Sequence, residues 1–209
     1  MLTFLLYFSI TNVNNLNGNI YSISNPDLSS SKQFPAIYGN NMEYFDIYSE
    51  PISSRYGDVY WAMMDPISLP SNIINRFNNK IMAITGYEMD QVIRTSSGDT
   101  SVPITWAYNH HYCAYLYDSN TKITSLNNII NPKDHGAFNH GAKQMWDISS
   151  ETNSTLNYQF FSEGNGGESR ASFHGYPTNM AQLIKSPHYF RIQPMQIDTR
   201  NRNNKYINN

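Results

Sequence analysis

The chain contains 209 residues, with a mass of 24.0 kDa, a formal net charge of −2 and a sequence pI of about 6.3. This length is sufficient for one well-packed domain. Only 14 residues are Lys or Arg and they form no basic stripe, so we expect no nucleic-acid partner. The single cysteine, Cys113, excludes an internal disulfide.

The amino-acid usage favours β structure. Aromatic residues make up 14% of the chain and 16 residues are Tyr, a residue that suits pleated, half-buried surfaces. Charged residues account for only 14%, and asparagine supplies much of the remaining polar surface. Many Asn and Ile with few Ala are typical of an AT-rich genome. The Asn-rich runs at 12–19 and 201–209 are therefore interpreted as composition bias before function.

The first 33 residues form a signal-like apolar start followed by a flexible lead. Leu2 to Ile10 is an apolar run of signal-peptide length, with no basic residue ahead of it and far too short to span a bilayer. The overlapping stretch "TFLLYFSI" also fits a first β-strand, and both interpretations stay open. Residues 12–33 are polar and rich in Asn and Ser, as in a flexible segment. No other segment approaches membrane-spanning length, so we expect no transmembrane anchor.

From residue 42 onward, strand-like runs follow one another, bounded by Pro and Gly. They lie at 42–52, 57–70, 80–94, 101–118, 156–164 and 188–198. The third run is expected to bend at Gly86. Two short helices interrupt the series: residues 69–80, with Ser71 as the N-cap, and residues 178–187, ended by Pro187.

This organisation predicts a mainly β protein. Strands separated by turns, with only one or two short helices, are typical of a β-sandwich or jelly-roll-like fold. We expect a single domain over residues 34–200. The tail at 201–209 is expected to be disordered.

Two adjacent histidines interrupt the apolar run "TWAYNHHYCAYLYD", which extends from Thr105 to Asp118. Burying the imidazoles of His110 and His111 without partners would cost about 1–3 kcal/mol each. A shared metal ion would remove that cost. Imidazole is a preferred protein ligand for copper and zinc, so the pair predicts a metal site.

The alternation of a β-strand opposes a shared ion. His110 is in phase with Tyr108 and Tyr112, whereas His111 is in phase with Cys113, and successive side chains point to opposite faces. Both histidines can reach one ion only if the strand is at an edge, or is bulged or twisted at Asn109–His110. Otherwise one histidine is the ligand and the other is a packed neighbour.

A third ligand must come from elsewhere in the chain. His174 is the first candidate, 63 residues after His111 and behind the glycine-rich stretch "EGNGGE", where the backbone can turn sharply. His135 and His140 lie in a glycine-containing loop and are alternatives. His188, at the start of the last strand, is the next candidate. The predicted metal ligands are thus His110, His111 and His174.

The residues His110-His111 and "GGESRASFHGY", with its lone His174, resemble the N-terminal copper domain of a known family. This family comprises the copper type II, ascorbate-dependent monooxygenases, such as the peptidylglycine and dopamine hydroxylases. The stretch "DVYWAMMDPISLP" is loosely similar to a strand that precedes the histidine pair in that family. The resemblance covers residues 44–176.

The resemblance implies a jelly-roll β-sandwich with a surface copper bound by His110, His111 and His174. In the family this copper passes electrons, and oxygen chemistry occurs at a second copper in a second domain, bound by a His-x-His pair and a Met. This chain contains no His-x-His and lacks the family's cysteines. A relative of this kind would bind copper, and monooxygenase activity would require a partner chain.

A non-catalytic module is the competing interpretation. Exposed aromatic side chains, among the Trp and the many Tyr, would suit a surface that binds a glycan, a small molecule or a partner protein. Cys113 fits a small buried residue better than a Cys–His nucleophile, although it would be a ligand candidate beside a copper ion. Either function predicts a secreted location, or the surface of a cell or virion.

Overall fold

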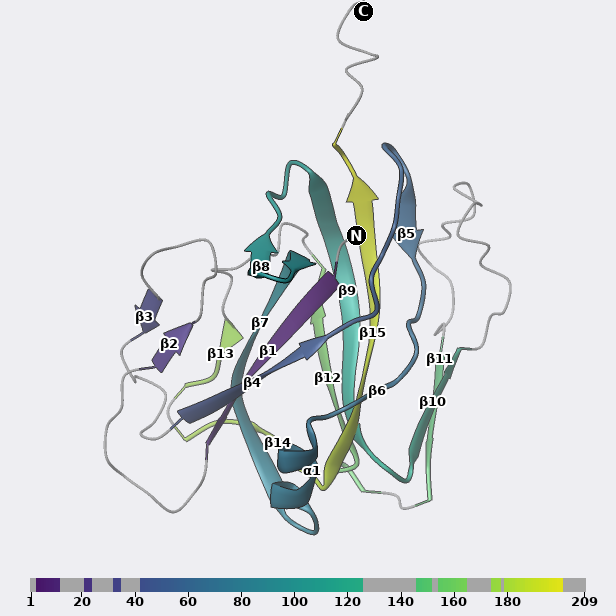
Figure 1. Cartoon of the computed structure of the whole chain (residues 1–209). Helices are drawn as coiled ribbons and strands as arrows, with labels where there is room; N and C mark the ends of the chain where they lie inside the picture. Colours follow the sequence, from purple (N-terminus) through teal and green to yellow (C-terminus); the bar gives the residue numbers. More distant parts are fainter. Residues whose placement is uncertain are drawn as a thin grey trace, which may run out of the picture.

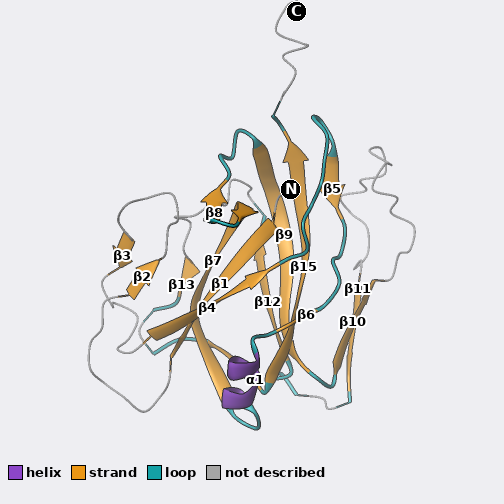
Figure 2. Ribbon diagram, viewed as in Figure 1, coloured by secondary structure: helices purple, strands orange, loops and turns teal. Residues whose placement is uncertain are grey.

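The computed structural model describes residues 3–11, 21–23, 32–34, 42–125, 146–151, 154–164, 174–177 and 179–200. Two antiparallel sheets face one another, and their strands pack as a sandwich (Figure 1). The single helix of the described part lies at one end of the sandwich (Figure 2). The prediction of a mainly β, sandwich-like domain is therefore confirmed.

The first sheet, here called sheet I, has the order β13-β7-β1-β4, and β7 also pairs with β8 and β14. Its strands are β1 (Thr3–Thr11), β4 (Met42–Tyr48), β7 (Ile81–Thr95), β8 (Gly98–Ser101), β13 (His174–Gly175) and β14 (Gln182–Lys185). The apolar N-terminal run forms β1, which pairs with β4 on one side and with β7 on the other.

The second sheet, sheet II, has the order β12-β9-β15-β5, and β15 also pairs with β6. Its strands are β5 (Val59–Trp61), β6 (Ile67–Ser68), β9 (Ala107–Asp118), β12 (Tyr158–Glu163) and β15 (Pro187–Asp198). Two hairpins complete the strands: β2 (Tyr21–Ile23) with β3 (Lys32–Phe34), and β10 (Thr121–Ser125) with β11 (Trp146–Ser150).

The main core lies between the two sheets and consists of apolar side chains from alternate positions on each. Sheet I contributes Met82, Ile84, Tyr87, Met89 and Ile184, and sheet II contributes Tyr112, Ala114, Leu116, Phe161, Phe190 and Ile192. The sheets are also tied at one side, where the Gln159 side chain on β12 donates a hydrogen bond to the Leu183 carbonyl on β14. In β9, the alternate residues Tyr112, Ala114 and Leu116 face this core, and the residues between them face the other side of sheet II.

The other face of sheet II, here called the outer face, carries a smaller cluster. Tyr115 and Tyr117 on β9 pack there with Ile123 on β10. The β10–β11 hairpin covers these tyrosines, which would otherwise be exposed. Burial raises the pKa of Tyr117 from 10.0 to about 12, an effect that the nearby Arg191 opposes.

The first predicted helix is present, as α1 (Ser71–Phe77). Its apolar residues Ile73 and Phe77 are spaced by one helical turn and both are buried. The predicted cap is wrong, because Pro70 occupies the N-cap position and Ser71 is already helical. A proline there presets the backbone without losing a helical hydrogen bond, since its missing N–H would have had no partner.

The second predicted helix, residues 178–187, is wrong. Gln182–Lys185 forms β14, paired with β7 through Ile81–Ile84. Ile184 is fully buried and its neighbour Leu183 is 42% exposed, which is the alternation of a strand. Pairing with β7 overrides the helix propensity of this short segment, which a single sequence does not reveal.

Candidate functional site

The histidine pair lies at a β-bulge in β9. His111 pairs with Met195 on β15, and Asn109 pairs with the very next residue, Gln196. His110 is therefore the extra residue, with no partner of its own across the ladder. A bulge at Asn109–His110 is one of the conditions under which both imidazoles can share a partner, and the register shows it.

The bulge turns both histidines to the outer face of sheet II. Asn109 and Tyr112, on either side of the pair, are both 0% exposed and face the core. His110 and His111 are each half-buried, so two consecutive side chains leave the core face before alternation resumes. The geometric objection to a shared ligand is thus removed by one inserted residue.

The two imidazoles point toward each other. Nδ1 of His110 and Nδ1 of His111 are 2.8 Å apart, within hydrogen-bond distance, with ring planes at 79°. One ring donates its Nδ1 proton and the other accepts it, in an order set by the tautomers. Two ring nitrogens this close on one face are also near the separation of two ligands on one metal ion.

Aromatic rings border the pair on both sides. The ring of Trp61, on β5, meets the ring of His111 edge-on, with centroids 5.6 Å apart. The ring of Tyr108 meets the ring of His110 in the same manner, also at 5.6 Å. β12 pairs with β9 only as far as Tyr112, so among the described strands the bulge pairs with β15 alone.

Cys113 lies on the same face as the pair, one alternation beyond His111, opposite Gln193 on β15. Burial raises the pKa of its thiol to about 11. The thiol therefore stays protonated near neutral pH in the metal-free protein, and it is a poor nucleophile in that state.

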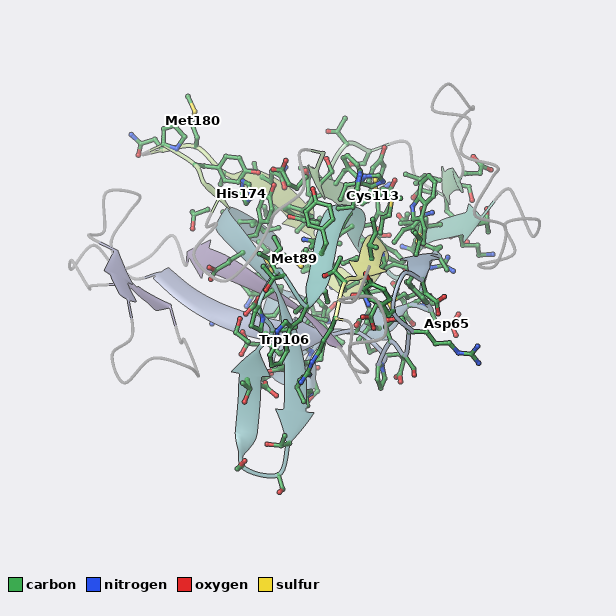
Figure 3. All side chains as sticks on the ribbon, turned by 90° about the horizontal axis from the view of Figure 1, so that it is seen from above. Asp65, Met89, Trp106, Cys113, His174 and Met180 are labelled. Carbon is green, nitrogen blue, oxygen red and sulfur yellow. The ribbon has the colours of Figure 1, made fainter. Side chains whose placement is uncertain are left out.

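His174 lies elsewhere. It is on β13 in sheet I, opposite Tyr87, and its ring stacks on the Tyr87 ring with centroids 4.8 Å apart. Tyr87 in turn contacts Phe161 in the core between the sheets. His174 therefore faces the inside of the sandwich, whereas the His110–His111 pair is on the outer face of sheet II. Figure 3 shows His174 and Cys113 over different strands.

The other histidine candidates are also apart from the pair. His188 is half-buried near the start of β15, with its ring 4.5 Å from that of Tyr189. His135 and His140 lie outside the described residues. Within the described part of the chain, no group of three or more His, Cys, Asp or Glu side chains is arranged to hold a metal ion. Metal binding by His110, His111 and His174 together stays a prediction.

The positions of Trp61 and Met195 beside the pair could not be predicted from the sequence. Each reaches the pair through a register that joins strands far apart in the chain: Trp61 pairs with Met195, and Met195 pairs with His111. No local pattern signals this row. The only local sign of the bulge is the adjacent pair of histidines, where strand alternation would place a single outward-facing residue.

No protein-family model, curated protein or solved structure matches this chain. Along the described residues, no helix has both the length and the apolar character needed to cross a membrane.

Proposed function

We propose that the chain is a copper-binding β domain in which His110 and His111 are the first ligands. The observation that supports this most strongly is the bulge, which places two Nδ1 atoms 2.8 Å apart on one face. A bulged strand beyond the end of its neighbour is where a sheet commonly re-aims side chains toward a functional site.

The proposed role is electron transfer at a surface outside the cytosol. Copper changes oxidation state readily, and imidazole suits both of its common states. The resembled family uses its histidine-pair copper for electron transfer. This chain contains no His-x-His for a second copper, so oxygen chemistry is assigned to a partner chain.

Metal content is the test of this proposal. Tag-free protein is loaded with copper under ascorbate, desalted and analysed by mass spectrometry, and we expect about one equivalent of copper per chain. His110→Ala and His111→Ala should each lose it. His188→Ala is the matched control, because it removes a half-buried histidine of the same sheet that lies apart from the pair.

His174→Ala separates the two possible ligand sets. Loss of copper in this variant would support the three-histidine site of the resembled family, and retention would place the third ligand elsewhere. Thermal unfolding of each metal-free variant accompanies the metal analysis, so that a loss of folding is not mistaken for a loss of binding. Wild-type protein without copper, or His110→Ala with full copper, would overturn the proposal.

A second candidate function is a binding module for a glycan or a protein. It is favoured by Tyr158 and Phe160 on β12, which are 36% and 40% exposed, with Phe160 packed on Tyr115 at 5.1 Å between ring centroids. An exposed aromatic ring that is held in place by a neighbouring ring can stack on a sugar or on a partner's aromatic side chain. A Tyr158→Ser, Phe160→Ser double variant that loses glycan-array or partner binding while keeping its thermal stability would support this function.

A further inference from the structure

Met195 lies directly opposite His111 on the outer face of sheet II. The register pairs these two residues across β9 and β15, and pairs Met195 with Trp61 across β15 and β5. Side chains directly opposite each other in an antiparallel pair have their Cβ atoms about 4.5–5.5 Å apart. The three side chains therefore form a row across three strands, with the methionine in the middle. Figure 1 shows β15 between β9 and β5.

The two outer rings of this row close over the methionine. Trp61 and His111 come from strands on opposite sides of β15, and yet their ring centroids are only 5.6 Å apart. Adjacent strands are about 4.8 Å apart, so rings that stood straight up from β5 and β9 would be separated by about twice that distance. At least one of the two rings must lean inward over Met195, in agreement with the 8% exposure of that side chain.

Other donors near the pair are less well placed. Cys113 shares the face, but it does not form a metal-holding group with the two histidines among the described residues. His174 is on the other sheet. Gln193, two residues before Met195 on the same face, is 5% exposed, and its side-chain oxygen has no hydrogen-bond partner among the described residues. The face thus offers one soft sulfur donor next to the pair and one unpaired oxygen beyond it.

We propose that the thioether sulfur of Met195 is the third ligand of the copper site, together with Nδ1 of His110 and Nδ1 of His111. This inference rests on the proposed function. A thioether is a soft, uncharged donor that favours Cu(I) over Zn(II) and Cu(II). The site is therefore selective for Cu(I), and the Trp61 ring shields the sulfur from solvent.

The hydrogen bond within the pair holds the two Nδ1 atoms close to the separation that a shared ion would require. With both rings neutral, one Nδ1 carries a proton that the other accepts across 2.8 Å. Binding of Cu(I) requires the donor ring to change tautomer, so that its proton moves from Nδ1 to Nε2 and the total number of bound protons is unchanged. Two nitrogens about 2.0–2.1 Å from one ion lie about 3.4 Å apart, so the two nitrogens must separate by a fraction of an ångström and both rings must turn toward the ion.

The alternative role of Met195 is purely structural: its sulfur would pack between two aromatic rings, a contact that methionine favours without any metal. Met195→Leu separates the two roles because it keeps nearly the same volume and removes the sulfur. Met180→Leu is the control, since Met180 is 61% exposed and lies well apart from Cys113, which is two residues after His111 (Figure 3). Cu(I) affinity is measured by competition with a chromogenic Cu(I) chelator under ascorbate.

We expect Met195→Leu to weaken Cu(I) binding at least about tenfold and to leave Zn(II) affinity unchanged, because zinc gains little from a thioether. Met180→Leu should bind Cu(I) as the wild type does. X-ray absorption at the copper edge should show sulfur scattering that disappears in Met195→Leu. In wild-type protein grown with selenomethionine it should be replaced by selenium scattering, a readout that requires no substitution.

Failure of the methionine ligand can be distinguished from failure of the proposed function. Wild-type protein that binds Cu(I) with nitrogen scattering alone, and with the same affinity as Met195→Leu, would overturn the methionine ligand and leave the copper proposal standing. Wild-type protein that binds no copper under ascorbate would overturn the proposed function, and the methionine ligand with it.

Discussion

A single inserted residue decides what the histidine pair can do. Without the extra residue at His110, regular alternation would leave one imidazole on the outer face of sheet II, between Asn109 and Tyr112, which face the core. With the extra residue, both imidazoles project from the outer face between Asn109 and Tyr112. The bulge is therefore part of the site, and its removal is a test of the fold that does not depend on metal.

We predict that deletion of His110 leaves the protein folded. After the deletion, Asn109 still faces inward, His111 outward and Tyr112 inward, and each keeps its partner on β15. The free energy of unfolding should change by no more than about 1 kcal/mol, as for a change on a sheet surface. Urea denaturation followed by tryptophan fluorescence measures this change.

Deletion of Cys113 is the matched control. It removes a residue from regular alternation in the same strand, so either Ala114 and Leu116 turn outward or the register to β15 slips. We expect a loss of more than about 3 kcal/mol, because at least one fully buried side chain leaves the core. Equal stability of the two deletion variants would contradict the bulge.

At the scale of elements, the sequence predicts strands well where the apolar runs are long. β7 and β15 appear within one residue of the expected bounds, whereas β9 begins at Ala107, six residues after the expected start. The bend expected at Gly86 coincides with a register shift, with Ser9 opposite Gly86 and Ile10 opposite Ile84. β14 was missed because four residues carry too little periodicity to outweigh helix-forming residues. The partner strand that decides its conformation is about a hundred residues away.

Burial beside the β10–β11 hairpin disfavours ionisation of the tyrosines on the outer face of sheet II. In the folded protein the pKa of Tyr117 is about 12, against 10.0 for an unperturbed tyrosine. Between those values the folded state retains a proton that the unfolded state has lost. The stability contributed by the neutral Tyr117 is thus complete below about pH 10, and it falls as the pH rises toward 12.

We predict that Tyr117→Phe removes this part of the alkaline stability loss. Ultraviolet absorbance of the phenolate, measured as the difference between wild type and variant across pH, should show one group titrating near pH 12. Between about pH 10 and 12 the free energy of unfolding should fall less steeply in the variant than in the wild type. A difference titration centred near pH 10 would mean that the hairpin leaves this ring open to water.

At the scale of the whole molecule, the interior of the sandwich becomes polar near the bulge. Gln91 on sheet I donates its side-chain N–H to the Ala107 carbonyl on sheet II at 3.2 Å, a hydrogen bond that joins the two sheets. Gln196 lies opposite Asn109 and is 0% exposed. Neither its oxygen nor its nitrogen has a hydrogen-bond partner among the described residues. One interior amide thus connects the sheets and the other does not.

We predict that Gln196→Met stabilises the protein by about 1–2 kcal/mol, because it replaces an unpaired buried amide with an apolar chain of similar length. Gln91→Met is the comparison in the same interior: it also removes a side-chain oxygen with no partner among the described residues, but it breaks the hydrogen bond to the Ala107 carbonyl. It should therefore destabilise the protein by about 1 kcal/mol. Urea denaturation gives both free energies. If Gln196→Met were destabilising to the same extent, Gln196 would have a buried partner such as an internal water, and the interior beneath the histidine pair would be a hydrated pocket.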